Sequence, residues 1–116
     1  EDEMNLLMKE FGDNPFIGYW HDFGHIQRKH NLLILNHEQF LRRMSSHLIG
    51  GHVNDVKWPA RDHQVPLLGG VVPFERLLPF FPHGVPLVWE LSSRVSSEDI
   101  RAARKLWMEK FPQTLA

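Results

Sequence analysis

The chain carries the stretch YWHDFGH at residues 19–25, where an apolar run from Phe16 to Trp20 ends abruptly in Asp22 and His25. Two later stretches repeat this arrangement. Residues 49–55, IGGHVND, end in a histidine and a carboxylate, and residues 85–90, VPLVWE, end in a carboxylate. Short apolar runs bounded by polar residues are typical of buried strands. The sequence therefore predicts three strands that each end in Asp, His or Glu.

The segments around these runs show helical periodicity. Residues 26–35 fit either a helical turn or a short apolar run, and residues 56–72, rich in Pro and Gly, predict a long loop of the kind that is usually functional. The last helix is expected to open at a capping box and to end at Pro112. The expected helices are residues 2–11, 38–46, 73–81 and 96–111, and the expected strands are residues 16–22, 48–54 and 85–90.

Helices and strands therefore alternate along the chain, which predicts an α/β fold with parallel strands and right-handed crossovers. Asp22, His52 and Glu90 lie 30 and 38 residues apart, about one βα unit each time. The carboxyl ends of parallel strands meet at one edge of the sheet, and this edge is where α/β folds place their active sites. The aromatic first run has no polar face, which predicts helices on both faces of the sheet.

Composition narrows the classes of function. The 116 residues allow one domain or part of one, and 42% hydrophobic with 23% charged residues is typical of a globular chain. A net charge of −1 without blocks of like charge argues against a nucleic-acid partner. No apolar stretch is long enough for a membrane helix. With no cysteine, any metal must be held by His, Asp and Glu, and a reducing, cytoplasmic location is expected.

Asp22, His52 and Glu90 are the strongest candidates for a site. Two carboxylates and an imidazole form a hard O/N donor set that suits Mn²⁺, Mg²⁺, Co²⁺ or Zn²⁺. Alternation places Gly18, Trp20 and Asp22 on one face of the first strand. The competing interpretation is that these residues are ordinary polar strand ends or helix caps.

Several other residues each allow both a functional and a structural interpretation. Residues 61–63, Arg-Asp-His, could close over a polar substrate or form a solvated charged loop, and Asp62 and His63 could instead bind another metal. Asp55 could orient a ligand histidine or cap the loop. His25 could share a ligand with Asp22 or lie free at the surface. Trp20 and Trp58 could line a sugar pocket or belong to the core. His21 should point away from Asp22 and be structural, and the remaining histidines read as surface or packing residues.

Taken together, these motifs resemble the C-terminal part of the xylose isomerase-like TIM barrels, the sugar phosphate isomerase/epimerase superfamily that also includes endonuclease IV. The resemblance covers nearly the whole chain, so that residues 1–116 would supply strands six to eight with their flanking helices. The matching segments are residues 18–25 at the end of strand six, 51–56 at strand seven, 62–74 in the loop after it, and 88–90 at strand eight.

The resemblance implies a divalent-metal-dependent sugar or sugar-phosphate isomerase or epimerase. Asp22, His52 and Glu90 would bind the metal, and Glu90 would also act as catalytic acid or base. His25, Arg61 and His63 would contact the hydroxyls of a sugar or hydroxy-acid substrate. A proton alpha to the carbonyl would leave to one glutamate, giving an enediolate stabilised by the metal, and would return from a partner glutamate.

The chain also departs from that family. The other metal-binding glutamate belongs to strand five, which this sequence lacks, and Leu68 stands where a glycine is common. About 116 residues is under half of a full barrel. We therefore expect self-association or a missing N-terminal half-barrel to cover the open sheet. Two alternatives remain, an endonuclease IV-like DNA repair nuclease and a non-catalytic barrel remnant that serves as an assembly module.

Overall fold

A computed structural model of the chain describes residues 2–115, and Glu1 and Ala116, the two ends of the predicted 1–116 domain, lie outside the described residues. The helices are α1 (Asp2–Phe11), α2 (Phe23–Asn31), α3 (His37–Met44), α4 (Phe74–Leu77) and α5 (Ser97–Lys110). Single 3₁₀ turns follow at Ser45–His47, Leu78–Phe80 and Pro112–Leu115. The strands are β1 (Tyr19–Asp22), β2 (Leu48–Val53), β3 (Asp55–Lys57), β4 (Arg61–Gln64) and β5 (Leu87–Trp89).

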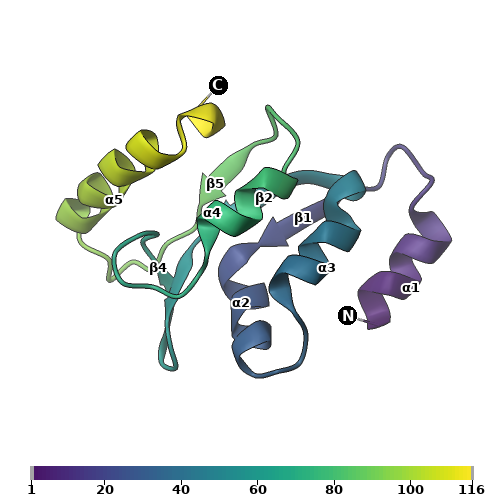
Figure 1. Ribbon diagram of the computed structural model, residues 1–116, viewed down its shortest axis with the longest axis horizontal. Coiled ribbons are helices and arrows are strands. Elements are labelled where there is room, and N and C mark those ends of the chain that lie inside the picture. Colours follow the sequence, from purple (N-terminus) through teal and green to yellow (C-terminus); the bar gives the residue numbers. More distant parts are fainter. Residues whose placement is uncertain (1, 116) are drawn as a thin grey trace.

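The predicted α/β architecture is confirmed at this level, because β1, β2 and β5 form a parallel sheet in that order (Figure 1). Asp22 is paired with His52, and His52 in turn with Val88. The three strands therefore end at the same edge, as the spacing of their polar residues predicted. No helix within residues 2–115 combines the length and the apolar character needed to cross a membrane.

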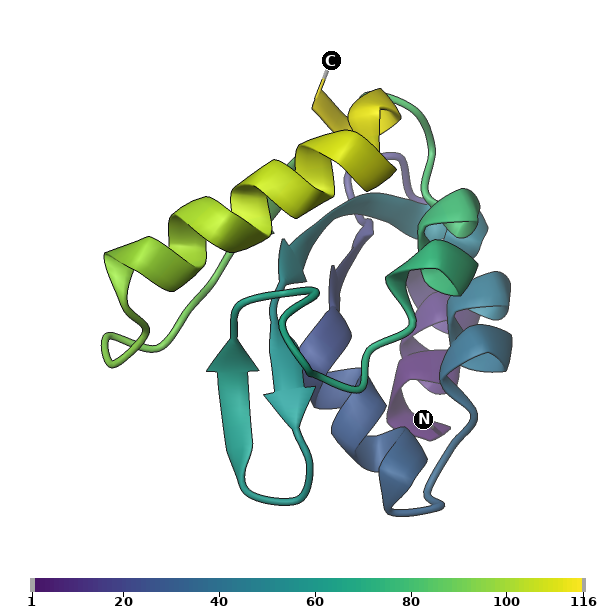
Figure 2. The ribbon, with the colours of Figure 1, turned by 60° about the vertical axis from the view of Figure 1, so that its left-hand side comes forward.

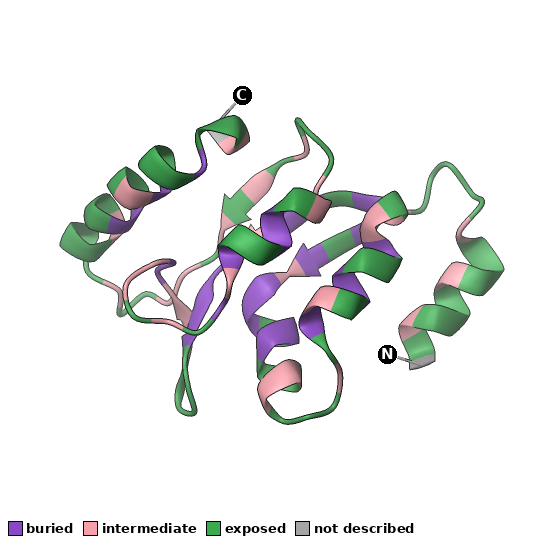
Figure 3. Cartoon of the chain, viewed as in Figure 1, coloured by how far each residue is buried: buried purple, intermediate pink, exposed green. Residues whose placement is uncertain are grey.

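The sheet is covered on one face only, contrary to the expectation of helices on both faces. On the covered side, β1 and β2 bury Tyr19, His21 and Val53 against an aromatic core (Figure 3). On the other side, large apolar side chains of the strands remain 37 to 53% exposed. An aromatic run without a polar face favours burial on both sides, but the sequence alone does not show what covers each side. The exposed side chains are Trp20, Ile49 and Val88.

Strand β1 is shorter than the predicted run of residues 16–22. Asn14 accepts a hydrogen bond from the Phe16 amide through its side chain and one from the Ile17 amide through its carbonyl oxygen. These bonds hold residues 14–17 in a turn, so pairing begins only at Tyr19. Phe16 consequently lies 93% exposed.

Residues 56–72 were expected to form a loop, and this prediction is wrong in part. Strands β3 and β4 form an antiparallel hairpin, with Asp55 opposite Gln64 and Lys57 opposite Arg61 (Figure 2). The helix-breaking Pro59 lies in the turn between the strands and not within either of them. Two strands of three and four residues are too short for their alternation to stand out in the sequence.

The other boundaries move by a few residues. Residues 26–35, which the sequence left open, contain most of α2, whose N-cap is Asp22. Pro79 shortens α4 to one turn followed by a 3₁₀ turn, as its missing amide hydrogen predicts. The predicted cap of α5 is confirmed, because the Ser96 hydroxyl accepts a hydrogen bond from the Asp99 amide at 3.1 Å.

A buried chain of polar side chains joins β1 to α2 and α3. The hydroxyl of Tyr19 lies 2.9 Å from Nδ1 of His21, whose Nε2 lies 2.9 Å from Nε2 of His37. The Nδ1 of His37 lies 2.7 Å from the amide oxygen of Gln27. His21 thus points away from Asp22 into the core, as predicted. Burial lowers the pKa of His37 to about 3, and nearby His30 contributes to this shift.

We predict that acid destabilises the fold through His37. The unfolded chain, in which histidine has a pKa of about 6.5, binds the proton more readily than the folded chain does. The contribution to stability is complete above pH 6.5 and declines as the pH falls toward 3. Between pH 7 and pH 5 the free energy of unfolding should drop by about 2 kcal/mol from this residue alone. Urea unfolding at both pH values measures the drop.

A His37→Gln variant is the control for this measurement. It retains a hydrogen-bonding side chain at the position but cannot titrate, so its unfolding free energy should change less between the two pH values. Equal changes in the variant and the wild type would contradict the assignment to His37.

Candidate metal centre

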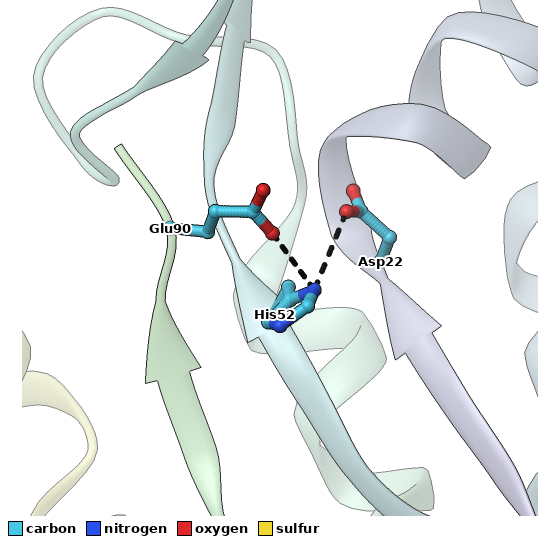
Figure 4. A group of neighbouring side chains, drawn as sticks. All are labelled: Asp22, His52 and Glu90. Carbon is cyan, nitrogen blue, oxygen red and sulfur yellow. Dashed lines mark ion pairs between the residues drawn. The ribbon is translucent and has the colours of Figure 1, made fainter. Parts of the chain in front are cut away.

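Three neighbouring strands bring Asp22, His52 and Glu90 together at their carboxyl ends (Figure 4). Asp22 is the last residue of β1 and pairs with His52 of β2, so both side chains project from the same face of the sheet. Glu90 directly follows β5, and its amide donates a hydrogen bond to the carbonyl oxygen of Val53 at 3.1 Å. This bond continues the ladder by one residue and fixes the backbone of Glu90 beside His52.

The distances between the candidate ligand atoms suit a small divalent ion. The Nδ1 atom of His52 lies 2.8 Å from a carboxylate oxygen of Glu90 and 3.9 Å from one of Asp22. One ligand atom from each of the three residues lies within 4.8 Å of the others. Ligand atoms around an ion with bonds of about 2.1 Å are roughly 3 to 3.4 Å apart at right or tetrahedral angles. The observed distances bracket this range, so the three residues could hold a metal ion.

The two oxygens of Asp22 have different partners. Oδ1 accepts hydrogen bonds from the backbone amide of His25 at 3.0 Å and from the side-chain amide of Asn54 at 3.4 Å. Oδ2 instead faces the Nδ1 atoms of His25 and His52. Asp22 is therefore a helix cap through one oxygen and a candidate ligand through the other. The two interpretations that the sequence left open are compatible, because the cap orients the second oxygen.

The imidazole of His52 is held by an aromatic neighbour. The ring of Trp20 meets it edge-on, with centroids 5.4 Å apart. Trp20 approaches this closely because it lies over Gly50, where any side chain would collide with the indole ring. Trp20 thus borders the candidate site instead of filling the core, while the Trp58 side chain, 37% exposed, lies in the hairpin turn.

The site is open to solvent. The side chains of Asp22, His52 and Glu90 are 18, 38 and 48% exposed. A catalytic metal site needs three protein ligands and at least one accessible position for water or substrate. Three ligands on an exposed sheet edge meet that requirement, whereas a structural metal site would normally be closed by a fourth side chain.

His25 and His63 lie beside the three candidate ligands. The Nδ1 atom of His25 is 3.6 Å from Oδ2 of Asp22, and the His25 and His63 rings meet edge-on with centroids 5.5 Å apart. The Nδ1 atom of His63 lies 3.3 Å from the carbonyl oxygen of Glu90. These two predicted substrate contacts therefore form a single wall next to the candidate ligands.

Arg61, the third predicted substrate contact, lies elsewhere. It begins β4 and lines a hollow together with Ser92 and Arg94. Within residues 2–115 no hydrogen bond or ion pair links Arg61 to Asp22, His52 or Glu90. The neighbouring Asp62 is also directed elsewhere, because its carboxylate pairs with Arg28 of α2 at 2.8 Å.

Asp55 caps the chain segment that follows the hairpin and does not orient a histidine. Its buried carboxylate accepts hydrogen bonds from the backbone amides of Val56, Leu67 and Val72 at 2.8, 3.4 and 2.9 Å. Burial raises the pKa of Asp55, and the hydrogen bonds from the backbone amides oppose that rise. Of the two roles that the sequence left open, the structure supports the cap.

Sequence reasoning missed the role of Asn54. Its side chain is buried and donates to Asp22 from 32 residues away, so only the tertiary structure reveals the contact. Gly24 makes room for it, since a Cβ atom at this position would overlap the Asn54 amide oxygen. The position of Asn54, directly after a strand whose last polar residue is His52, was the only signal available.

Comparison with known proteins finds no matching family model, no matching curated protein and no matching solved structure. The conclusions about this site therefore rest on its own geometry. That geometry establishes a mixed α/β domain with a three-stranded parallel sheet, and at the carboxyl edge of this sheet a group of three side chains that could hold a metal ion.

We predict that Asp55→Ala destabilises the protein by at least about 3 kcal/mol, because it removes the acceptor of three backbone amides and buried unpaired donors each cost about 1 to 3 kcal/mol. Denaturant unfolding measures the loss. Asp62→Ala is the matched control, since it breaks only an exposed ion pair and should cost less than about 1 kcal/mol. Similar losses in the two variants would contradict the capping role.

Proposed function

We propose that the chain is the C-terminal part of a xylose isomerase-like barrel and that the protein is a divalent-metal-dependent sugar or sugar-phosphate isomerase or epimerase. One observation carries the proposal. Asp22, His52 and Glu90 converge at the carboxyl ends of three adjacent parallel strands, which is the edge where barrel enzymes place their chemistry. In this assignment β1, β2 and β5 are barrel strands six, seven and eight.

The uncovered face of the sheet supports the same proposal. In a closed barrel, helices cover the outer face of the strands and the inner face surrounds the barrel interior. Here the covered face carries the helical core, and the bare face carries Trp20, Val88 and the three candidate ligands. The proposal assigns this bare face to the barrel interior.

The residues of this chain can support proton transfer next to a carbonyl group. A divalent ion held by Asp22, His52 and Glu90 would polarise substrate oxygens and stabilise developing negative charge. The Glu90 carboxylate, 48% exposed, can accept or return a proton. The imidazoles of His25 and His63 can form hydrogen bonds to substrate hydroxyls. The second glutamate of the proposed mechanism is not in this sequence.

An endonuclease IV-like nuclease is the second candidate, favoured by the His25 and His63 imidazoles beside the three candidate ligands. Such chemistry uses several metal ions and therefore needs additional ligands. The net charge of −1 argues against it, because phosphate contacts require a basic surface. Binding to a duplex with an abasic site at low salt tests this candidate, and absence of binding would exclude it.

We predict that the purified chain binds Mn²⁺, Co²⁺ or Zn²⁺ and that His52→Ala lowers the affinity at least about 100-fold. Loss of a residue that only orients a ligand already costs 10- to 100-fold, so loss of a ligand should cost no less. Isothermal titration calorimetry of chelator-treated protein measures the affinity, and elemental analysis measures the metal that remains after purification.

His83→Ala is the matched control, since it removes an exposed histidine that precedes β5, whereas Glu90 follows the other end of that strand. It should leave the affinity unchanged. Absence of metal binding by the wild type, or equal affinity of the His52→Ala variant, would contradict the proposal.

We predict that the bare face makes the chain self-associate in isolation, because exposed strand edges and apolar side chains favour pairing. Val88→Lys places a charge on that face, on the outer strand β5, and should shift the chain toward monomer in light scattering. Met108→Lys is the control, because Met108 is similarly exposed, at 40% against 48% for Val88, but belongs to α5. A monomeric wild type with a cooperative thermal transition would argue against an obligatory partner.

A further inference from the structure

A polar hollow of about 430 Å³ lies next to the candidate metal centre, between the hairpin and the loop that leads to α5. Its volume is within the range of small-molecule sites. Polar side chains of two segments about 30 residues apart line it. They are Arg61, Asp62 and Gln64 on β4, and Ser92 and Arg94 on the loop.

The loop is fixed against β4 by hydrogen bonds. The Ser92 amide donates to the carbonyl oxygen of His63 at 2.8 Å. The Ser92 hydroxyl accepts from the Arg94 amide at 3.2 Å, and the Val95 amide donates to the Ser92 carbonyl at 3.1 Å. This turn places Arg94 beside the same hollow that Arg61 lines. It also leaves the hydrogen of the Ser92 hydroxyl free to donate to a ligand.

The charge of the hollow is positive. Within residues 2–115, neither Arg61 nor Arg94 makes an ion pair or hydrogen bond through its guanidinium group, whereas Arg28 and Arg76 are each paired with a carboxylate. The one acidic side chain of the hollow, Asp62, is already paired with Arg28 at 2.8 Å. Two unpaired arginines therefore face the same space. Planar guanidinium groups bind phosphate and carboxylate groups through paired hydrogen bonds.

The hollow adjoins the candidate metal centre. Ser92 follows Glu90 by two residues, a reach of roughly 7 Å of extended chain. His63 contacts both places. Its carbonyl oxygen accepts the hydrogen bond from the Ser92 amide, and its Nδ1 atom lies 3.3 Å from the carbonyl oxygen of Glu90. The hollow and the candidate metal centre are therefore linked through His63 and the short segment from Glu90 to Ser92.

We propose that this hollow is an anion subsite in which Arg61, Arg94 and the Ser92 hydroxyl bind the phosphate or carboxylate group of a substrate whose other end reaches the metal centre. As a substrate subsite it rests on the function proposed above, and it restricts the substrates to acidic ones, namely sugar phosphates or sugar acids. Anion binding itself requires no metal ion and is measured separately.

Amide NMR of the full chain, treated with chelator, tests the subsite by titration with methyl phosphate and, in a parallel series, with glycolate. Saturable shifts are expected at residues 61–64 and 92–95. Arg61→Gln and Arg94→Gln should each weaken binding at least about tenfold, because each removes a charge-assisted pair of hydrogen bonds. Tighter binding of methyl phosphate assigns the subsite to phosphate esters, and tighter binding of glycolate assigns it to carboxylates.

Arg101→Gln is the matched control, since Arg101 is an exposed arginine on α5 with no partner among the described residues. It removes the same charge and should leave binding unchanged. Shifts that never saturate, or equal affinity in the double Arg61→Gln/Arg94→Gln variant, would overturn the subsite. Saturable anion binding in a protein that binds no metal would preserve the subsite and refute the proposed function instead.

Discussion

The register between β1 and β2 determines both the core and the candidate site. With Asp22 opposite His52, one face of these strands carries the candidate ligands and the other buries His21. A slip of one residue would reverse every side chain of the strand. Asp22 would then enter an apolar core, while His21 would leave that core and lose its partner His37. The same strand register therefore determines both the packing of the core and the geometry of the site.

Residues at the carboxyl ends of the strands also orient the carboxylate of Asp22. Asp22 ends β1 and begins α2, so the cap that starts the helix also directs an oxygen toward His52. Asn54, which follows β2, supports the same carboxylate, and its approach depends on Gly24. The orientation of the Asp22 carboxylate thus results from one local backbone contact and one tertiary side-chain contact, while the site stays exposed to solvent.

The sequence was sufficient to predict the three parallel strands and the convergence of Asp22, His52 and Glu90, because each residue lies at the end of a strand-like run. It was not sufficient for the hairpin, whose strands of three and four residues are defined by pairing between Asp55 and Gln64 and not by alternation. The contact of Asn54 with Asp22 depends on tertiary structure, as does the burial of His37. The assignment to the barrel family and the isomerase or epimerase activity remain predictions, because no family model, curated protein or solved structure matches the chain.

The buried chain from Tyr19 to Gln27 has a direction. The Gln27 amide donates to Asn31, so its oxygen accepts from His37, which must carry its hydrogen on Nδ1. The Nε2 atom of His37 then accepts from His21, whose hydrogen is on Nε2, and Nδ1 of His21 accepts from Tyr19. The two imidazoles are therefore opposite tautomers. Every donor hydrogen points along the chain away from Tyr19 and toward Gln27, so the tautomer of one histidine sets that of the other.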